Sequence, residues 1–394
     1  MRILFLTARY PWPLLRGDQL RAHHQLRLLA RRHRLTLVCF RDAHVPSAGL
    51  AAVSAFCERV VTVPLGRTAA GLGLARGAFS PLPFQVSLHR HPRMRRALER
   101  VLEEQAFDLV HAQLVRIAPY VESFPVPRFV DLVDALSLGM RRRSLQHRGP
   151  LRWLTALEAE RLLRYERRIC ASVEGASVVS SVERDAIGAT ADIGVVPNGV
   201  DLGEFPFGRD GREPATIVMT GNMGYFPNIS AACWFAERVH PLVRRSVPEA
   251  RFLVIGARPA ARVRRLARAD PPVSVLGFVD DLRPHLRSAT LAVAPMQAGA
   301  GQQFKMIEAM ASGTPVVATP VAAAAFEGGG DGLLVAETPE AFAGAVVSIL
   351  RDPGRAGRLA AQARRFVEDC HTWERSTAHL EELHEAARSR RGAR

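Results

Sequence analysis

The sequence lacks several features that would place a protein in a class at once. Its five cysteines are scattered, and no two of them form a Cys-x-x-Cys pair. This spacing indicates neither a disulfide framework nor a zinc site. No apolar run approaches the ~20 residues needed to cross a bilayer. The apolar stretch at 3–6 is too short for the core of a signal peptide, so we expect a cytoplasmic protein.

Aromatic residues are also scarce, at 7% of the chain, while the formal net charge is +15. A charge of this size is typical of proteins that bind nucleic acid, an anionic membrane surface or polyanionic small molecules. The basic clusters at 141–143 and 388–394 contain no aromatic residue. They therefore lack the stacking platform on which single-stranded nucleic acid binds, and we expect no nucleic-acid partner.

Lysine is nearly absent. Lys305 is the only one, and the other 52 of the 53 basic residues are arginine. Before it, the apolar segment 291–294 predicts a buried strand, Gly299 and Gly301 predict a tight turn, and a helix is expected from about Gln302. The free N–H groups at a helix start, and the positive end of its dipole, attract anions, and glycines let a phosphate approach the backbone.

Lys305 and Glu308 are predicted to share the outer face of this helix, because Phe304, Ile307 and Ala311 have the spacing of its buried face. A lysine beside a glycine-lined helix start suits a diphosphate. A carboxylate one turn further on can accept hydrogen bonds from sugar or ribose hydroxyls. The alternative is a surface ion pair between the two side chains, worth only a few tenths of a kcal/mol.

The length of 394 residues predicts two domains rather than one core. Strands alternate with helices in both halves, which predicts an α/β protein with two doubly wound, Rossmann-like parallel sheets. Pro197-Asn198-Gly199 interrupts regular secondary structure, and we place the domain boundary there. The predicted segments are an N-terminal domain at 1–197, a C-terminal domain at 198–370, and a C-terminal helix with a basic tail at 371–394. Expected strands are 2–7, 35–40, 60–64, 108–111, 129–133, 178–180, 195–196, 216–220, 251–255, 273–276, 291–294, 316–318 and 333–335.

Ligands bind at the carboxyl ends of parallel strands, where several polar residues of the first half are expected. Gly17 can bring backbone amides close to a ligand, and Arg21, on a helix expected at 19–32, can reach an anion. Asp18 also fits a plain helix cap. His111 and Asp134 follow strands and could act as general bases or orient an acceptor hydroxyl, with a helix cap or a satisfied polar contact as the alternative for each.

A second glycine loop, 220–225, follows the first strand of the second half. Gly221 and Gly224 lack the Gly-x-Gly-x-x-Gly spacing of a dinucleotide site, so neither a nicotinamide nor a flavin cofactor is predicted.

These motifs, in this order, resemble those of the retaining glycosyltransferases with the GT-B fold, of the family-4 type. More narrowly, they are similar to bacterial sugar transferases associated with exopolysaccharide and exosortase (PEP-CTERM) gene clusters. The landmarks span nearly the whole chain: Gly17-Asp18-Gln19-Leu20-Arg21, Phe107-Asp108-Leu109-Val110-His111, Asp131-Leu132-Val133-Asp134, Val196-Pro197-Asn198-Gly199-Val200-Asp201, Gly221-Asn222-Met223-Gly224-Tyr225-Phe226-Pro227-Asn228, Gly277-Phe278-Val279-Asp280-Asp281 and the stretch from Lys305 to Thr319.

The resemblance implies two domains facing across a cleft, with a C-terminal helix able to cross back. It implies a UDP- or GDP-sugar donor in the C-terminal half and a glycan or polyprenyl-linked acceptor in the N-terminal half. Such enzymes retain the anomeric configuration without a bound metal or other cofactor, and the leaving phosphate takes the acceptor proton.

The resemblance also implies roles for single residues. Lys305 would meet the diphosphate, Glu308 the ribose hydroxyls, and the backbone at Phe278 and Val279 the base. Gly17 would cap the diphosphate from the other domain. The predicted catalytic residues are His111 and Asp134, and the donor set is Gly17, Asp18, Arg21, Gly221, Asn222, Phe278, Val279, Gly299, Gly301, Gln302, Lys305 and Glu308.

Two departures from the family pattern concern the donor. Ala300 stands where many relatives carry a second glutamate, so hydroxyl recognition would fall to backbone or to Gln302 and Gln303. Asn222 and Tyr225 stand where many relatives carry basic residues. Charge on the diphosphate would then rest on Lys305 and on amide dipoles, with help from Arg21.

The leading hypothesis is thus a transferase that extends a cell-surface glycan or exopolysaccharide while attached peripherally to the cytoplasmic membrane, where basic residues favour anionic lipid. A nucleotide-sugar epimerase of the same architecture is a second hypothesis, and it would need no acceptor. A basic nucleic-acid-binding protein is a third, although no reader module is present.

Overall fold

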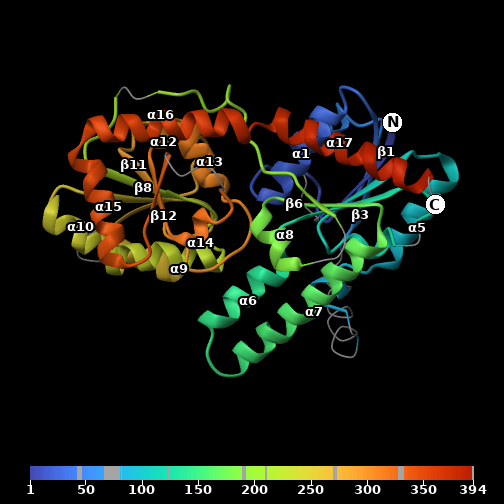
Figure 1. The fold of residues 1–394 in the computed structure, drawn as a ribbon, viewed down its shortest axis with the longest axis horizontal. Helices are drawn as coiled ribbons and strands as arrows, with labels where there is room; N and C mark the ends of the chain where they lie inside the picture. Colours follow the sequence, from blue (N-terminus) through green and yellow to red (C-terminus); the bar gives the residue numbers. More distant parts are fainter. Residues whose placement is uncertain are drawn as a thin grey trace. The chain divides into compact units, whose positions relative to one another are not determined.

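The computed structural model describes residues 1–41, 47–65, 80, 82–122, 124–188, 192–208, 211–268, 273–326 and 332–392. The chain divides into two compact units, which are coloured along the sequence in Figure 1. Unit 1 comprises Met1–Pro197 and Trp373–Arg394, and unit 2 comprises Asn198–Thr372. The C-terminal helix therefore belongs to unit 1, although 175 residues of unit 2 precede it in the sequence.

Unit 1 is built on a parallel sheet with the strand order β3-β2-β1-β4-β5-β6-β7. Because β1 pairs with both β2 and β4, the strand order reverses between β1 and β4. This reversal is the topological switch point, beside which α/β sheets bind their ligands. The strands are β1 (Arg2–Thr7), β2 (Arg34–Arg41), β3 (Arg59–Pro64), β4 (Leu109–Gln113), β5 (Arg128–Val133), β6 (Gly175–Val178) and β7 (Ile193–Val195).

Helices cover both faces of this sheet, because successive side chains of each strand point to opposite sides. Ile3 and Phe5 of β1 join one buried cluster with Leu26 and Leu380, whereas Leu4 and Leu6 join another on the opposite face. The helices are α1 (Gly17–Leu29), α2 (Ser47–Ser54), α4 (Phe84–Ser87), α5 (Pro92–Glu104), η1 (Ala118–Tyr120), α6 (Leu136–Gln146), α7 (Pro150–Ser172), α8 (Ser181–Ile187) and α17 (Trp373–Gly392).

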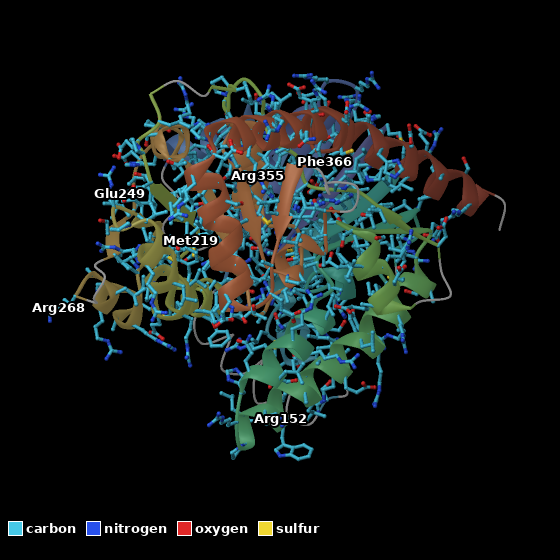
Figure 2. The ribbon with its side chains drawn as sticks, turned by 60° about the vertical axis from the view of Figure 1, so that its left-hand side comes forward. Arg152, Met219, Glu249, Arg268, Arg355 and Phe366 are labelled. Carbon is cyan, nitrogen blue, oxygen red and sulfur yellow. The ribbon has the colours of Figure 1, made fainter. Side chains whose placement is uncertain are left out.

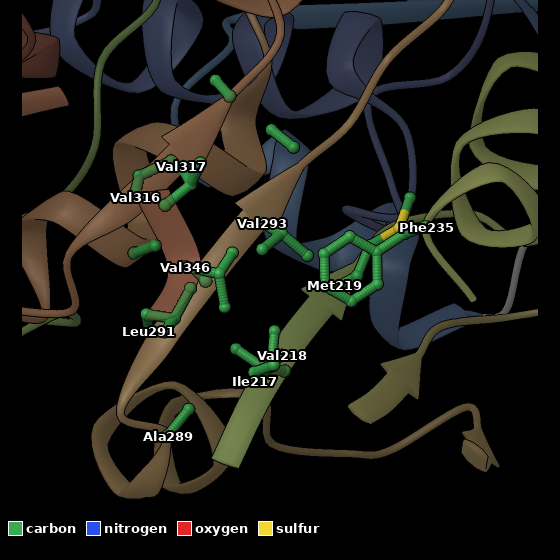
Figure 3. Packing of buried hydrophobic residues seen from close by; sticks show 14 of the residues in the cluster. Ile217, Val218, Met219, Phe235, Ala289, Leu291, Val293, Val316, Val317 and Val346 are labelled. Atoms are coloured by element: carbon green, nitrogen blue, oxygen red, sulfur yellow. The ribbon is translucent and has the colours of Figure 1, made fainter. Parts of the chain in front are cut away.

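Unit 2 has a parallel sheet with the strand order β10-β9-β8-β11-β12-β13, and its switch point lies between β8 and β11. Figure 3 shows Val218, Val293 and Val317, which lie on three neighbouring strands, together with Val346 from a covering helix. The strands are β8 (Thr216–Thr220), β9 (Arg251–Ile255), β10 (Val273–Gly277), β11 (Leu291–Ala294), β12 (Val316–Ala318) and β13 (Leu333–Val335).

The helices of unit 2 follow these strands in sequence, as parallel connections require. They are α9 (Phe226–Trp234), η2 (Phe235–Val239), α10 (His240–Ser246), α11 (Ala261–Arg265), η3 (Leu266–Arg268), α12 (Arg283–Ser288), α13 (Phe304–Ala311), α14 (Pro320–Ala323), α15 (Pro339–Arg351) and α16 (Pro353–Cys370).

Several predicted boundaries were wrong, among them the helix expected at 19–32, which is α1 at 17–29, and three further cases show a physical reason. The strand expected at 178–180 is β6 at 175–178, because pairing with β5 fixes its register and Ser180 is already the N-cap residue of α8. The strand expected at 195–196 is β7, which ends at Val195. The helix expected from Gln302 begins at Phe304, because Gln303 is its extended N-cap residue.

Candidate functional site

The loops that follow β8 and β11 meet the carboxyl edge of the unit 2 sheet at its switch point. Each loop depends on glycines in the left-handed region, with φ of 144° at Gly221, 124° at Gly299 and 79° at Gly301. A residue with a side chain rarely adopts such angles, so the glycine pattern seen in the sequence has a direct backbone cause. The tight turn predicted at 299–301 stays a prediction, although both of its glycines have the positive φ angles that such a turn uses.

The Lys305 side chain reaches from the first turn of α13 to the first turn of α9, beside the loop after β8. Its Nζ donates a hydrogen bond to Oδ1 of Asn228, at 2.5 Å, and lies 3.6 Å from the sulfur of Met296. A Cβ atom at Gly221 would lie 3.3 Å from the Lys305 Nζ and 3.0 Å from the side-chain Nδ2 of Asn228. Gly221 is therefore the residue that leaves room for the ammonium group at the switch point.

The surface ion pair considered for Lys305 and Glu308 does not form, since the Lys305 ammonium group is directed to Asn228 instead. Burial lowers the pKa of Lys305 to about 8, although the charge of Glu308 opposes this shift. Burial likewise raises the pKa of Glu308 to about 7, opposed by Lys305 and assisted by Glu204. A poorly solvated cation held by neutral groups gains strongly from an arriving anion, which suits this corner to a phosphate.

Two residues assigned to the donor from the sequence have structural duties instead. The side-chain amide of Gln302 accepts a hydrogen bond from the Asn198 N–H at 2.6 Å and donates one to the Ala325 carbonyl at 2.9 Å. Both ends of this amide are thus committed to fixing the loop, and we withdraw Gln302 as a sugar-binding side chain. The side chain of Asn222 accepts from the Gly224 N–H at 3.0 Å, which closes the turn after β8.

The loop after β10 presents an aromatic ring to solvent at the same sheet edge. Phe278 is 58% exposed, while Val279 packs partly against the core. Gly277, with φ of 76°, makes the turn that precedes them. An exposed aromatic ring on a fixed turn can stack on a nucleobase.

Sequence reasoning missed Asn228, which holds Lys305, and Arg258, which follows β9. Arg258 is an exposed residue with φ of 56°, and its backbone would lie 3.2 Å from a Cβ atom at Gly224. A strained non-glycine residue beside a ligand-binding loop is a recognised sign of function. Arg258 offers a second cation at an edge where the resemblance had indicated missing basic residues.

In unit 1, charged residues gather at the carboxyl ends of β1, β4 and β5. The carboxylate of Asp18, in the first turn of α1, forms an ion pair with Arg9 from the loop after β1. Asp18 is therefore held by a side chain rather than acting as the plain helix cap that was the alternative. Its neighbour Gly17 is the first residue of α1 and is exposed.

Asp134 lies directly after β5 and is partly exposed. Burial raises its pKa to about 6; Arg21 and Arg116 lower the pKa, and Asp18 raises it. The residue before it, Val133, has φ of 63°, and Leu114 at the end of β4 has φ of 77°. A β-branched residue in the left-handed region is strained, and such strain concentrates at functional sites. Asp134 is thus a carboxylate of modest basicity on a fixed turn.

Arg21 does not meet a phosphate. Its Nε donates to Oδ2 of Asp131 at 2.7 Å, and both side chains are fully buried. Burial alone would raise the pKa of Asp131, but the charge and hydrogen bond of Arg21 outweigh it and the pKa is lowered. The donor role assigned to Arg21 is therefore corrected to that of a buried structural partner.

His111 is also buried completely. Its ring stacks on Phe5 with 4.1 Å between ring centroids, and its Nδ1 lies 2.9 Å from Nε2 of His384 on α17. Burial lowers the pKa of His111 to about 4, against the opposing charge of Asp131. A neutral histidine that joins the core to the C-terminal helix does not reach a substrate, so we do not carry His111 forward as a catalytic group.

Comparison with known proteins gives a consistent result. Residues 214–352 match the family model described as glycosyl transferases group 1. A phosphatidyl-myo-inositol mannosyltransferase of Mycolicibacterium smegmatis is 26% identical over 304 residues, which are 73% of this chain and 75% of that protein. These matches support a glycosyltransferase.

Solved structures agree with the fold. Sucrose-phosphate synthase from Thermosynechococcus elongatus has a TM-score of 0.75 at 19% identity, over 98% of each chain. HepE from Anabaena, in complex with UDP, has a TM-score of 0.68 at 15% identity, over 97% of this chain and 99% of that one. The two Rossmann-like α/β units therefore match the GT-B fold, as the sequence predicted.

Proposed function

We propose that the protein is a retaining glycosyltransferase that moves a sugar from a nucleoside-diphosphate donor to a glycan or lipid-linked acceptor in cell-surface polysaccharide synthesis. The observation that carries this proposal is the Lys305 ammonium group, held by Asn228 against Gly221 at the switch point of unit 2. The match to group 1 glycosyltransferases spans both of the loops that build this corner.

A nucleotide-sugar donor is supported by HepE, which has been crystallised with UDP and with UDP-glucose. In this proposal Lys305 neutralises the diphosphate, the amides at 299–303 surround it, and Arg258 adds positive charge. Glu308 accepts hydrogen bonds from ribose hydroxyls, while Phe278 and Val279 hold the base. Gly17 and Asp18 remain predicted donor contacts from unit 1.

The transfer requires no covalent enzyme intermediate. The bond between the anomeric carbon and the diphosphate oxygen breaks, and its electron pair goes to the phosphate. The acceptor oxygen bonds to the same face of that carbon, and its proton passes to the departing phosphate. Lys305 stabilises the charge that develops on this phosphate, which is where a preorganised cation contributes most.

Asp134 is the residue proposed to orient the acceptor hydroxyl in unit 1. With a pKa raised to about 6, its carboxylate is ionised at neutral pH and can accept a hydrogen bond from that hydroxyl. The charges of Arg21, Asp18, Asp131 and Arg116 act on it. The mannosyltransferase relative has a phospholipid in its name, which supports a lipid-linked acceptor and peripheral attachment to a membrane. Among the residues described here, no helix combines the length and apolar character that spanning a bilayer demands.

The test is a thermal-shift screen of the whole protein against UDP, GDP, ADP, TDP and CMP, repeated on Lys305→Met. A ligand at about 100 times its dissociation constant stabilises the folded state by roughly 2.7 kcal/mol. For a unit of this size such a gain raises Tm by about 5–10 °C. One diphosphate should shift the wild type but not the variant. If no nucleotide shifts the wild type while DNA or RNA does, the proposal is wrong.

A further inference from the structure

The helical hairpin formed by α6 and α7 extends away from the sheet of its own unit (Figure 1). Figure 2 shows Arg152 at the free end of this hairpin. α7 is anchored directly beside this free end, because the buried carboxylate of Glu158 accepts hydrogen bonds from the N–H groups of Phe84 and Gln85, at 2.9 and 3.1 Å. The free end is thus a rigid projection with a fixed orientation on unit 1.

Apolar side chains are exposed at this free end to an unusual degree. Eleven large hydrophobic residues are exposed among the residues that the structure describes, and five of them fall within 145–157. Trp153 is the most exposed of all, at 78%, and Leu145 follows at 70%. Spacings of three and four residues place Trp153, Leu154 and Leu157 on one side of α7. Clustered exposure of this kind marks an interaction surface, whereas single exposed residues do not.

The same stretch has charge of one sign only. Residues 145–157 contain Arg148 and Arg152 and no aspartate or glutamate, and three more arginines precede them at 141–143. The side chains of Arg141, Arg148 and Arg152 are exposed, and within the described part of the chain no ion pair joins any of the three to a carboxylate. The tip therefore combines an apolar surface with uncompensated positive charge.

We propose that the hairpin tip, defined as residues 145–157, is the surface by which the protein binds an anionic lipid membrane. The apolar side chains would enter the boundary between headgroups and acyl chains, where tryptophan is favoured, while the arginines contact lipid phosphates. Their long stems let them do both, since the methylene groups lie in the apolar layer and the guanidinium group in water. A second copy of this chain fits less well, because it would bring two sets of unpaired arginines together.

This inference uses the proposed function only to explain why a membrane should be approached, namely to reach a lipid-linked acceptor. The test is co-sedimentation of the whole protein with phosphatidylcholine vesicles, with and without phosphatidylglycerol, at low and high salt. We expect binding only when phosphatidylglycerol is present, and weaker binding at high salt because the charges are screened. On binding, the tryptophan emission should shift to the blue, and Trp153→Phe should remove most of that shift.

Three variants separate the contributions. Trp153→Glu should weaken vesicle binding at least about tenfold. The double variant Arg148→Gln/Arg152→Gln should weaken it about 25-fold at low salt, because each basic residue near the surface contributes about fivefold. Val335→Glu is the matched control, since Val335 is 51% exposed in unit 2, and it should bind as the wild type does.

Nucleotide binding, measured by thermal shift, should be unchanged in all three variants. If the protein binds vesicles but responds to no nucleotide, the hairpin tip is still supported as a membrane-binding surface, and the proposed function is refuted. If the protein responds to a nucleotide but does not bind anionic vesicles, the proposed function stands and the membrane-binding surface is refuted. Equal vesicle binding by Trp153→Glu and the wild type would show that another surface is used. If the wild type dimerises without lipid, binds no vesicle, and becomes monomeric as Trp153→Glu, the tip is instead an interface between copies.

Discussion

Replacing Lys305 by methionine gives the sharpest test of the donor site. The change keeps most of the aliphatic packing and removes only the charge that Asn228 and Met296 now hold. A phosphate oxygen about 4 Å from Nζ would interact with it by about 4 kcal/mol at an effective dielectric constant of 20. In the variant, water and the dipole of α13 still stabilise the phosphate and so replace part of this interaction energy. We therefore expect a net loss of about 2.7 kcal/mol, which lowers kcat/KM about 100-fold.

Stability separates this role from a structural one. Burial lowers the pKa of Lys305, which means that the fold disfavours its charged form when no ligand is present. Lys305→Met should then leave the Tm of the free protein unchanged or slightly higher. Arg262→Met is a suitable control, because Arg262 pairs with Glu237 on the surface, where such pairs contribute little. A loss of kcat/KM below threefold with an intact fold, or a fall in Tm that accounts for the lost activity, would refute the reasoning.

The pH dependence of kcat/KM, compared between the wild type and Lys305→Met, provides a second test. Diphosphate binding needs the Lys305 cation, whose pKa is about 8, so kcat/KM should fall as pH rises through 8. Ribose binding uses the ionised carboxylate of Glu308, whose pKa is about 7, so kcat/KM should also fall as pH drops through 7. The expected optimum is therefore narrow, between about pH 7 and 8. In Lys305→Met the alkaline limb should vanish, while the acidic limb remains and moves to higher pH because the lysine no longer lowers the Glu308 pKa.

Three further predictions concern other residues. Asp134→Asn should lower kcat at least about tenfold, and the additional fall in kcat below pH 6 that the Asp134 pKa predicts should be lost, while the fall due to Glu308 remains. Gly221→Ala should weaken nucleoside-diphosphate binding at least about tenfold through backbone strain and crowding of the lysine, whereas Gly344→Ala, on an open helix face, should be neutral or stabilising. Burial lowers the pKa of His111 and His371 to about 4, so the unfolded chain takes up protons first as pH falls. Each should cost about 2 kcal/mol of stability between pH 7 and pH 5, and His111→Phe should reduce the measured fall in Tm.

Strands were predictable from the sequence because a buried parallel strand needs a continuous apolar run. The runs at 2–7, 216–220 and 291–294 have the same limits in the structure as in the prediction. Boundaries failed at the residues that directly precede helices. Ser180 is the N-cap residue of α8, with extended backbone angles and no side-chain capping hydrogen bond, and the strand expected to include it ends before it. Gln303 postpones the start of α13 by two residues for the same reason, since the capping residue has extended backbone angles.

The site was predictable where backbone geometry demands a residue type, and was missed where the deciding partner is remote. Gly221, Gly299 and Gly301 stand at positive φ, which leaves a pattern in the sequence. Asn228, by contrast, is one of many polar residues at helix starts, and nothing local shows that it contacts a lysine 77 positions away. Gln302 was misjudged for the same reason, because local sequence spacing does not reveal its hydrogen bonds to Asn198 and Ala325.

Arg21 and Lys305 show what separates a structural cation from one that awaits a ligand. Both were assigned to the diphosphate; Arg21 is fully buried, and Lys305 is half-buried. Arg21 meets the carboxylate of Asp131, which also accepts from Ser177 and from the Val133 N–H, so its charge is already balanced inside the fold.

Lys305 has only neutral direct partners, an amide oxygen and a thioether, and in the described chain no ion pair reaches it, so the charge of Glu308 balances it only in part. An unbalanced charge at low dielectric is costly, and a fold retains one where an opposite charge arrives from outside. On this argument, adding a carboxylate beside the ammonium group should mimic the ligand's charge. Asn228→Asp should raise the Tm of the free protein and weaken diphosphate binding together. Unchanged binding would mean that the phosphate lies elsewhere.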